Sequence, residues 1–462
     1  MRLKSDKRRK NQQVLAFLDE SRGEAPKATE GGTESFAAKH KTESPAMGEQ
    51  LMEVICEREN CKQAWARVKA NQGSPGIDGR TVEELPEHLK QPWPAIREQR
   101  LRGTYEPRPV RRVEIPKPSG GVRKLGIPTV LDRFIQPAVM QALQRRWDPT
   151  FSEASYGFRP GRWAHQAGAQ AQQYMAEGYS WVVDLDREKF FDRVHHDKRM
   201  ARIAERISDK RLLKRIRRCL QAGVMENGRV SPVDEGTPQG GPLSPWLSNI
   251  ALDELDRELE RRGHRQVRYA DDCKGYVRSQ RAGEPVMESM TRFLTTELKL
   301  KVNPAKSAVA QPGARKFLGF SFTWGEEPRR RIATKAVLRF KARIGELTRR
   351  TRGVSIERMA KDLSQYLRGW IGYFGKCQTP SVLESLEQWL RRRLRSAMWK
   401  QWKRGQTRFA ELRKRGVGKD LAAQTAGSAH GPWHLANSPA LTIALPNAYF
   451  HSLGIPRLIV AS

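Results

Sequence analysis

Two adjacent aspartates lie between two runs of strand-forming residues in the segment VRYADDCKGYV, which spans Val267 to Val277. Asp is a preferred turn residue, so Asp271 and Asp272 are typical of the tip of a tight hairpin. A tight hairpin also lifts two carboxylates out of its sheet, where they could bind a metal ion. The segment therefore predicts two short strands around residues 270–272 and leaves two interpretations open, an ordinary turn and a metal site.

A second strand-like segment, WVVDLD, carries further acids. Asp184 and Asp186 stand two residues apart in it, so a strand places both side chains on one face. Hard divalent cations prefer anionic oxygen, and two such ions repel each other unless carboxylates bridge them. One acid at the end of a strand and two on a neighbouring hairpin meet that need. The combination predicts two-metal phosphoryl transfer, in which one ion activates the attacking hydroxyl and the other stabilises the leaving pyrophosphate.

Positive charge dominates the composition. Lys and Arg number 85 against 51 Asp and Glu, which gives a formal net charge of +34. Such an excess destabilises a compact fold by self-repulsion unless a polyanion compensates it, so nucleic acid is the leading expected partner. No apolar run approaches the roughly 20 residues that span a bilayer, so no membrane partner is expected.

Cysteine usage favours a reducing cytosol. The chain has an odd number of cysteines and no CxxC pair, which argues against a disulfide framework and a structural zinc module. The five cysteines are Cys56, Cys61, Cys219, Cys273 and Cys377. Residues 1–46 are rich in Lys, Glu, Ser and Gly and poor in aromatics, which predicts a disordered basic extension.

The order of predicted elements, mixed strands and helices followed by a basic helical region, indicates an α/β core with an α-helical appendage. RRVEIPKPSGGVRKLGIPTVLDRFIQPAVMQAL is typical of a strand, a turn, a second strand and a helix from about Val130. Beyond Phe322 the sequence becomes helical and strongly basic. Four leucines recur there at helical spacing: Leu383, Leu386, Leu390 and Leu394.

Seven motifs resemble those of one known family. The blocks DLDREKFFDRVHHD, GTPQGGPLSPWLSNIALDELD and RYADD stand in the order found in group II intron reverse transcriptases. The segments IPKPSGGVRKLGIPTVLDRFIQ, SYGFRPGR, LKLKVNPAKS and KFLGFSF are similar to other fingers and palm motifs of that family. The resemblance runs from about Met47 to the C terminus. It implies an α+β right-hand polymerase, with fingers, a palm that contains an antiparallel sheet, and an α-helical thumb or maturase domain.

The resemblance implies five segments: a disordered basic extension (1–46), fingers with an N-terminal extension (47–180), the catalytic palm (181–325), the helical thumb or maturase domain X (326–405) and a DNA-binding-like C-terminal segment (406–462). The last segment resembles that of bacterial class C members, which lack the endonuclease domain of many relatives. We therefore expect no second-strand cleavage, and priming from another source such as a nascent strand at a replication fork.

Carried over residue by residue, the resemblance makes Asp186, Asp271 and Asp272 the catalytic, metal-binding aspartates. Asp271 is expected to be the more direct ligand of the adjacent pair. Asp184 is expected to be a structural or supporting acid, because the family does not require an acid at that position. The implied cofactor is two Mg²⁺ ions, for which Mn²⁺ can substitute.

The resemblance also implies five contacts with the incoming dNTP: Lys117, Arg123, Phe190, Gln239 and Lys306. Lys117 and Arg123 flank a glycine turn and would clamp the triphosphate through charge-assisted hydrogen bonds, although the bare pattern also suits a solvated hairpin. Phe190 would block a 2'-hydroxyl and select dNTPs, Gln239 would pack near the nascent base pair, and Lys306 would neutralise pyrophosphate. A core phenylalanine and a surface lysine are the simpler interpretations of Phe190 and Lys306.

Arginines crowd one helix of the expected thumb. So dense a cluster is costly unless it meets phosphate, which predicts an RNA-binding surface. The cluster consists of Arg391, Arg392, Arg393 and Arg395. Four tryptophans of the same region are expected to pack between helices rather than to stack on bases: Trp370, Trp389, Trp399 and Trp402.

Several positions depart from the family pattern. Arg187 replaces an apolar residue after the first catalytic aspartate, and strand alternation points it into the underside of the palm. A guanidinium there must find a carboxylate or reach solvent. Lys274 and Gly275 replace expected apolar residues after YADDC, and Trp163 and His195 stand where a small residue and an asparagine are expected. These changes keep every metal ligand but point to a weakened polymerase as an alternative.

The resemblance implies an intron-encoded RNA-directed DNA polymerase that copies intron RNA into DNA and binds that RNA to assist splicing and mobility. Expected partners are group II intron RNA, an RNA template with a DNA primer, target DNA and dNTPs. The expected location is the bacterial cytoplasm, with nucleoid association on DNA. Two alternatives stay open: an RNA-binding splicing maturase with a weakened polymerase, and a domesticated host reverse transcriptase in DNA repair.

Overall fold

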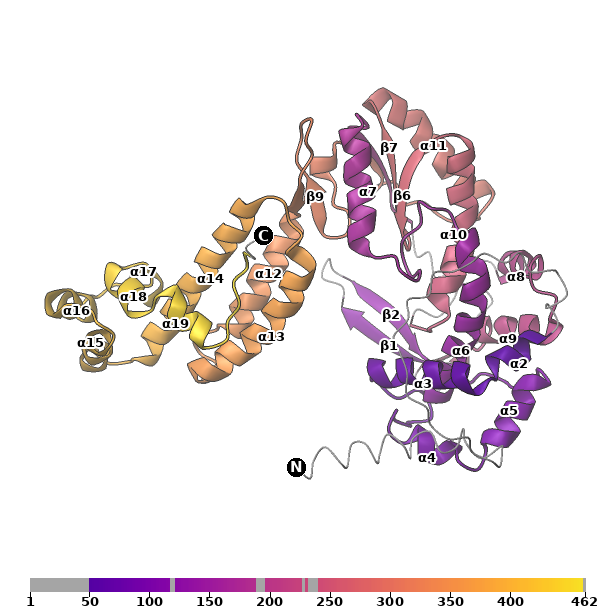
Figure 1. The fold of residues 1–462 in the computed structure, drawn as a ribbon, viewed down its shortest axis with the longest axis horizontal. Coiled ribbons are helices and arrows are strands. Elements are labelled where there is room, and N and C mark those ends of the chain that lie inside the picture. Colours follow the sequence, from indigo (N-terminus) through magenta and orange to yellow (C-terminus); the bar gives the residue numbers. More distant parts are fainter. Residues whose placement is uncertain (1–49, 117–120, 188–195, 227–228, 232–239, 460–462) are drawn as a thin grey trace, which may run out of the picture. The chain divides into compact units, whose positions relative to one another are not determined.

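The computed structural model describes residues 50–116, 121–187, 196–226, 229–231 and 240–459 (Figure 1). The predicted N-terminal extension lies outside the described residues. So do four residues singled out from the sequence: Lys117, Phe190, His195 and Gln239.

Two compact units alternate along the chain. Unit 1 comprises Met1–Trp163, Val183–Gly275 and Glu284–Ala308. Unit 2 comprises Ala164–Val182, Tyr276–Gly283 and Val309–Ser462. Neither unit is one continuous stretch of sequence, because the chain passes from one to the other several times.

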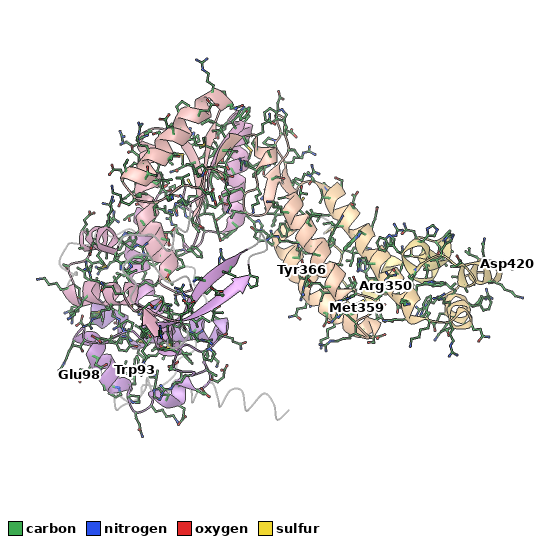
Figure 2. The ribbon with its side chains drawn as sticks, turned by 180° about the vertical axis from the view of Figure 1, so that it is seen from behind. Trp93, Glu98, Arg350, Met359, Tyr366 and Asp420 are labelled. Carbon is green, nitrogen blue, oxygen red and sulfur yellow. The ribbon has the colours of Figure 1, made fainter. Side chains whose placement is uncertain are left out.

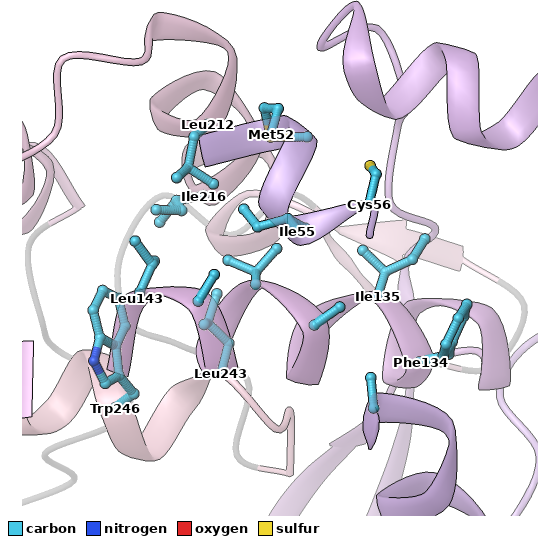
Figure 3. Packing of buried hydrophobic residues seen from close by; sticks show 14 of the residues in the cluster. Met52, Ile55, Cys56, Phe134, Ile135, Leu143, Leu212, Ile216, Leu243 and Trp246 are labelled. Carbon is cyan, nitrogen blue, oxygen red and sulfur yellow. The ribbon is translucent and has the colours of Figure 1, made fainter. Parts of the chain in front are cut away.

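Helix α6 (Val130–Trp147) runs through the hydrophobic core of unit 1. It begins where the sequence predicts a helix, and the Thr129 hydroxyl caps it by accepting a hydrogen bond from the backbone N–H of Asp132 at 3.1 Å. Most of its apolar side chains are buried, because the same core takes residues from many other helices (Figure 3). These are α2 (Leu51–Ile55), α3 (Arg58–Asn71), α4 (Leu85–Leu89), α5 (Trp93–Leu101), α8 (His196–Ala204), α9 (Lys210–Leu220) and α10 (Ser244–Arg261).

A four-stranded sheet takes two strands from before α6 in the sequence and two from after it. Its strands are β1 (Val110–Pro116), β2 (Val122–Ile127), β4 (Val224–Glu226) and β5 (Arg229–Ser231), in the order β2-β1-β4-β5. The pair β1 and β2 is antiparallel, which confirms the two strands predicted from the sequence before α6, while the turn predicted between them lies outside the described residues. Gly240 has a φ of +120° and lies against β2, where a Cβ would stand 2.8 Å from the Gly126 carbonyl oxygen. Only glycine satisfies both conditions.

The second four-stranded sheet carries the aspartates. Its order is β6-β7-β3-β8, and its strands are β6 (Arg265–Tyr269), β7 (Asp272–Val277), β3 (Trp181–Leu185) and β8 (Ala308–Ala310). The predicted hairpin is confirmed, since only Ala270 and Asp271 separate the end of β6 from the start of β7. Helix α11 (Gln280–Thr296) follows β7.

Unit 2 is mainly helical, as the sequence beyond Phe322 predicts. Its helices are α7 (Ala164–Ala176), α12 (Thr334–Leu347), α13 (Ile356–Phe374), α14 (Pro380–Gln401), α15 (Gly405–Lys414), α16 (Lys419–Ala426), α17 (Pro432–Leu435), α18 (Pro439–Ala444) and α19 (Asn447–Ser452). The short strands β9 (Phe320–Phe322) and β10 (Arg330–Ile332) pair antiparallel. Met359 on α13 belongs to the hydrophobic core of unit 2, and Tyr366 on the same helix packs against that core (Figure 2).

The leucine and tryptophan predictions for unit 2 are confirmed in the core. The four leucines of α14 that recur at helical spacing are all buried. Trp370, Trp399 and Trp402 are buried too, and Trp389 packs partly buried against the same core. In the part of the chain that the structure describes, no helix is both long enough and apolar enough to cross a membrane.

Candidate active site

The three predicted catalytic aspartates lie at neighbouring strand ends in unit 1. Asp186 directly follows β3, Asp271 lies in the turn after β6, and Asp272 begins β7, the strand beside β3. The backbone of Asp186 is held on both sides: its N–H donates to Ser307 Oγ at 3.0 Å, and its carbonyl accepts from the Asn303 N–H at 2.8 Å. The sequence therefore brings the two acidic segments to one region of one sheet.

The turn that carries Asp271 has a conformation that few residues adopt. Ala270 has a φ of +57°, in the left-handed region. Gly157, from the motif SYGF, lies so close to this turn that a Cβ there would stand 2.2 Å from the Ala270 nitrogen. The absence of a side chain at Gly157 thus permits the close backbone approach that supports the aspartate turn.

A fully buried arginine, Arg268, holds the same turn from within. Its guanidinium donates to the Ala270 carbonyl at 2.9 Å and to the Asp256 carboxylate at 2.6 Å. Further hydrogen bonds run to Asn249 Oδ1 at 2.9 Å and Ser155 Oγ at 2.7 Å. Burial by itself would lower the pKa of Arg268, but the Asp256 carboxylate raises it above its ordinary value. Arg268 therefore remains charged and fully hydrogen-bonded inside the unit.

Sequence reasoning missed this role of Arg268. The available signal was the position of the residue, an arginine on a strand beside two aspartates, in the quoted motif RYADD. Its partners Ser155 and Asn249 also lie in quoted motifs, but nothing local connects residues so far apart along the chain.

Lys274 is buried, with 4% of its surface exposed, and it contacts two carboxylates. Its Nζ forms a very short contact with Asp184 Oδ1 and lies 3.0 Å from Asp272 Oδ1. Burial would lower the pKa of this ammonium, but the two carboxylates outweigh burial and raise the pKa. Lys274 stands where the family has an apolar residue, and Asp184 on the neighbouring strand compensates its buried charge.

Arg187 and Gly275 are the other departures in this region. Arg187 is buried, as strand alternation predicts, and its backbone bridges that of Val302. Burial raises the pKa of the Cys273 thiol to about 12, while the positive charge of Arg187 acts in the opposite direction. A Cβ on Gly275 would lie 3.5 Å from Val183 Cβ, an ordinary packing distance, so the strand tolerates glycine without requiring it.

Two of the predicted dNTP contacts lie within the described residues. Lys306 is largely exposed, with its Nζ 3.6 Å from Asp186 Oδ2. Arg123 is exposed on β2, opposite Ile115 on β1. The predictions for Lys117, Phe190 and Gln239 concern residues outside the described ranges.

The donor chemistry of the aspartates fits a hard divalent cation, because all three offer carboxylate oxygen from adjacent strand ends. Among the residues described, no three His, Cys, Asp or Glu side chains lie close enough together to hold an ion. The carboxylates of Asp186 and Asp272 lie instead beside ammonium groups, those of Lys306 at 3.6 Å and Lys274 at 3.0 Å. The carboxylate oxygens and their placement at neighbouring strand ends therefore suit a metal ion. Two of the three carboxylates lie beside an ammonium group of the protein itself.

The predicted open arginine surface on α14 is wrong for Arg391. Only 2% of this residue is exposed; it pairs with Glu387 at 3.2 Å and lies over the Phe450 ring. Arg391 borders the groove on this face, but a side chain so deeply buried and already paired with a carboxylate is not an open phosphate contact. Its burial could not be read from the sequence, because Phe450 lies 59 positions further along the chain than Arg391.

The three neighbouring arginines are partly exposed, and each donates a hydrogen bond to another segment of unit 2. Arg392 donates to the Trp433 carbonyl at 3.0 Å and stacks 4.2 Å from the centre of its ring. Arg393 donates to Thr348 Oγ at 2.7 Å, and Arg395 donates to the Leu445 carbonyl at 3.0 Å. A groove of about 440 Å³ lies along this face, and its lining includes Arg392, Arg395 and Trp433.

Two family models match consecutive parts of the chain. Residues 115–322 match the family described as reverse transcriptase (RNA-dependent DNA polymerase), and residues 337–416 match the group II intron, maturase-specific domain. Together these matches cover more than half of the sequence. The chain belongs to the group II intron reverse transcriptases.

Curated relatives agree with this family. This group II intron reverse transcriptase is 36% identical over 220 residues to Protein YkfC of Escherichia coli (strain K12), covering 46% of this chain and 58% of the relative. It is 42% identical over 156 residues to the group II intron-encoded protein LtrA of Lactococcus lactis subsp. cremoris, covering 34% of this chain and 26% of the relative. The chain thus spans less than two thirds of either relative.

The family membership confirms the predicted fold class, α+β with the right-hand polymerase architecture, and group II intron reverse transcriptases generally use divalent metal ions. Among solved structures, a chain of a partial Cas6-RT-Cas1–Cas2 complex is 25% identical. The likeness covers 54% of this chain and 43% of that one, with a TM-score of 0.35, too low to add to the assignment.

Proposed function

We propose that this group II intron reverse transcriptase is an intron-encoded RNA-directed DNA polymerase. It copies intron RNA into DNA and binds the same RNA to assist splicing and mobility. The observation that carries the proposal is the placement of Asp186 and the Asp271–Asp272 turn at neighbouring ends of β3 and β7, inside the matched reverse transcriptase region. Its partners are intron RNA, an RNA template with a DNA primer, target DNA and dNTPs, in the bacterial cytoplasm or on the nucleoid.

Asp186, Asp271 and Asp272 are the proposed ligands of two Mg²⁺ ions, with Mn²⁺ as a substitute. When bound, such ions supply charge stabilisation to the attacking 3'-hydroxyl and to the leaving pyrophosphate. The protein's own contribution is to position the carboxylates. Arg268 and Gly157 hold the turn that bears Asp271, and Ser307 holds the backbone of Asp186.

The five dNTP contacts implied by the resemblance are part of the same proposal. Lys306 lies beside Asp186 and is exposed, so it can reach a triphosphate at the site. Arg123 is exposed on β2 and is proposed to bind the triphosphate together with Lys117. Phe190 and Gln239 keep their proposed roles in sugar selection and base-pair packing. The five-segment division into extension, fingers, palm, thumb and C-terminal segment also remains part of this proposal.

The proposed RNA-binding surface is narrower than the sequence alone suggests. Arg392 and Arg395 line a groove together with Trp433, an arrangement of cations and an aromatic ring that suits phosphate and base. Arg393 is partly exposed and can join them. Arg391 is left out, because it is buried against Phe450 and paired with Glu387.

The decisive experiment is extension of a DNA primer on an RNA template with dNTPs and Mg²⁺. Asp271→Asn is expected to lower the extension rate by about 1000-fold, because it removes one ligand charge from the metal site. RNA binding should stay unchanged. Glu98→Gln is the matched control, since it removes one exposed carboxylate from α5 (Figure 2) and should extend normally. Normal extension by Asp271→Asn would contradict the proposed site.

A second candidate function is a splicing maturase with a weakened polymerase. The ammonium of Lys274 beside Asp272 favours it, because a fixed cation competes with a metal ion for that carboxylate. The same assay separates the two functions: intron RNA binding without RNA-templated extension by the unaltered protein identifies the maturase.

A further inference from the structure

Three charged side chains form a line across β3 and β7, and Lys274 stands in its middle. Asp272 and Lys274 are two residues apart on β7, so they share a face of the sheet. Asp184, on the neighbouring strand β3, reaches the same ammonium. We call these residues the Lys274 triad: Asp184, Lys274 and Asp272.

The three side chains are buried to different extents, and the extent of burial indicates the role of each. The side chain of Lys274 is 5% exposed and that of Asp184 is 13% exposed, whereas that of Asp272 is 38% exposed. Burying an ammonium is costly unless an opposite charge accompanies it. Asp184 is therefore the inner counter-ion that allows Lys274 to remain charged inside the unit. Asp272 is the outer partner and still faces solvent.

The contact with Lys274 engages one particular atom of Asp272. The Nζ of Lys274 lies 3.0 Å from Oδ1, and no ion pair within the described residues involves Oδ2. Asp272 is therefore held in one rotamer, with one oxygen shared with the ammonium and the other free for an external cation. Neither Asp186 nor Asp271 has a buried cation of this kind in the part of the chain that the structure describes.

We propose that Lys274 is a positioning residue of the metal site, which fixes Asp272 through Oδ1 and leaves a single oxygen of that carboxylate for a divalent ion. The proposal rests on the proposed function only for the role of Asp272 as a metal ligand. Two consequences follow from electrostatics. The divalent ion is bound more weakly than it would be by an unpaired Asp272, and Asp184 acts on the site only through Lys274.

The test uses a substitution that leaves the net charge of the protein unchanged. Asp184→Leu combined with Lys274→Met removes one negative and one positive charge, and it replaces a buried ion pair with apolar side chains of similar size. Any change in metal affinity then reports the lost contact with Asp272 rather than the long-range field. The affinity of the full-length protein for Mn²⁺ is measured by electron paramagnetic resonance, without nucleic acid or nucleotide.

The double variant is expected to bind Mn²⁺ about tenfold more tightly than the unaltered protein, and to need correspondingly less Mg²⁺ for half-maximal primer extension. Adding Asp272→Asn to the double variant should abolish the gain. The control Glu87→Leu combined with Lys90→Met removes an exposed ion pair from α4 in unit 1, and it should leave Mn²⁺ affinity unchanged.

Stability measurements keep the test interpretable. Lys274→Met alone leaves Asp184 buried without its ammonium, so its urea midpoint should fall, and addition of Asp184→Leu should restore it. If the leucine and methionine pair does not fold, Asp184→Asn with Lys274→Gln replaces it. Unchanged or weaker Mn²⁺ binding in a folded double variant overturns the inference. Absence of primer extension by the unaltered protein contradicts the proposed function alone, because Mn²⁺ binding is measured without substrates.

Discussion

At the scale of single residues, the aspartate turn depends on side chains that take no part in chemistry. Arg268 links the Ala270 carbonyl to Asp256 on α10, and every one of these groups is buried. Removing one partner of a buried ion pair leaves the other as an uncompensated charge, which costs far more than the pair itself contributes. The position of Asp271 is therefore sensitive to residues that lie outside the aspartate turn itself.

Arg268→Met is expected to lower the free energy of unfolding by about 3–5 kcal/mol, because it leaves Asp256 buried without its cation. Urea denaturation measures this loss. Arg257→Met is the matched control: Arg257 is half exposed and pairs with Asp253 on the same helix, so its removal should cost less than about 1 kcal/mol. Equal losses in the two variants would show that Arg268 has no special structural role.

His165 gives unit 2 a dependence on pH. Its ring packs 4.9 Å from that of Tyr373, and burial lowers its pKa below the ordinary value of 6.5, with Arg330 and Lys376 lowering it further. The unfolded chain therefore binds the proton more readily than the folded chain. The stabilising effect is complete above pH 6.5 and is lost as pH falls through the lowered pKa.

His165→Phe keeps an aromatic ring against Tyr373 but removes the titrating group. Between about pH 7.5 and about pH 5.5, the urea midpoint of the unaltered protein should fall further than that of the variant. The comparison between the two proteins cancels the titration of other groups. Parallel pH profiles would contradict this account of His165.

At the scale of elements, α14 joins α12 and α13 of the unit 2 core to the helices that follow it. One face carries the buried leucines, and the opposite side carries arginines that donate to carbonyls of later segments. Arg392 and Arg395 therefore each have two roles: each donates a hydrogen bond to a later segment, and each lines the groove beside Trp433. RNA affinity and the free energy of unfolding must both be measured to separate these roles.

Arg392→Ala combined with Arg395→Ala should weaken RNA binding and reduce the slope of log K against log salt by about 1 to 2, as expected for two lost phosphate contacts. Titrations of labelled RNA at several salt concentrations measure this slope. Arg358→Ala, which removes an exposed arginine paired with Asp362 on α13, is the control and should leave the slope nearly unchanged. A full slope in the double variant would assign the two arginines to stability alone.

At the scale of the whole molecule, local patterns predicted the elements well. The hairpin of Asp271 and Asp272, the strands before α6 and the buried leucine stripe of α14 all depend on residues within one or two turns of each other. Strand alternation also placed Arg187 in the interior correctly. Such features follow from side-chain periodicity and turn chemistry, which a sequence displays directly.

Pairings between distant residues could not be predicted in this way. Lys274 and Asp184 are 90 positions apart, and each looks anomalous until the other is known. Arg268 and Ser155 are 113 positions apart. Arg391 looked like a surface residue because Phe450, which covers it, lies in a different helix. In each case the missing information is which strand or helix becomes a neighbour, which only the folded chain supplies.

The alternation of the chain between unit 1 and unit 2 has a consequence for biosynthesis. Unit 1 includes residues up to Ala308, whereas unit 2 already receives Ala164–Val182. An emerging polypeptide therefore cannot complete unit 1 until about two thirds of the protein has left the ribosome. During that interval the earlier segments wait with unpaired strand edges, which is the condition under which chains aggregate or recruit chaperones. Slowing translation once Ala308 has emerged from the ribosome should therefore favour the soluble yield of this protein more than slowing it elsewhere.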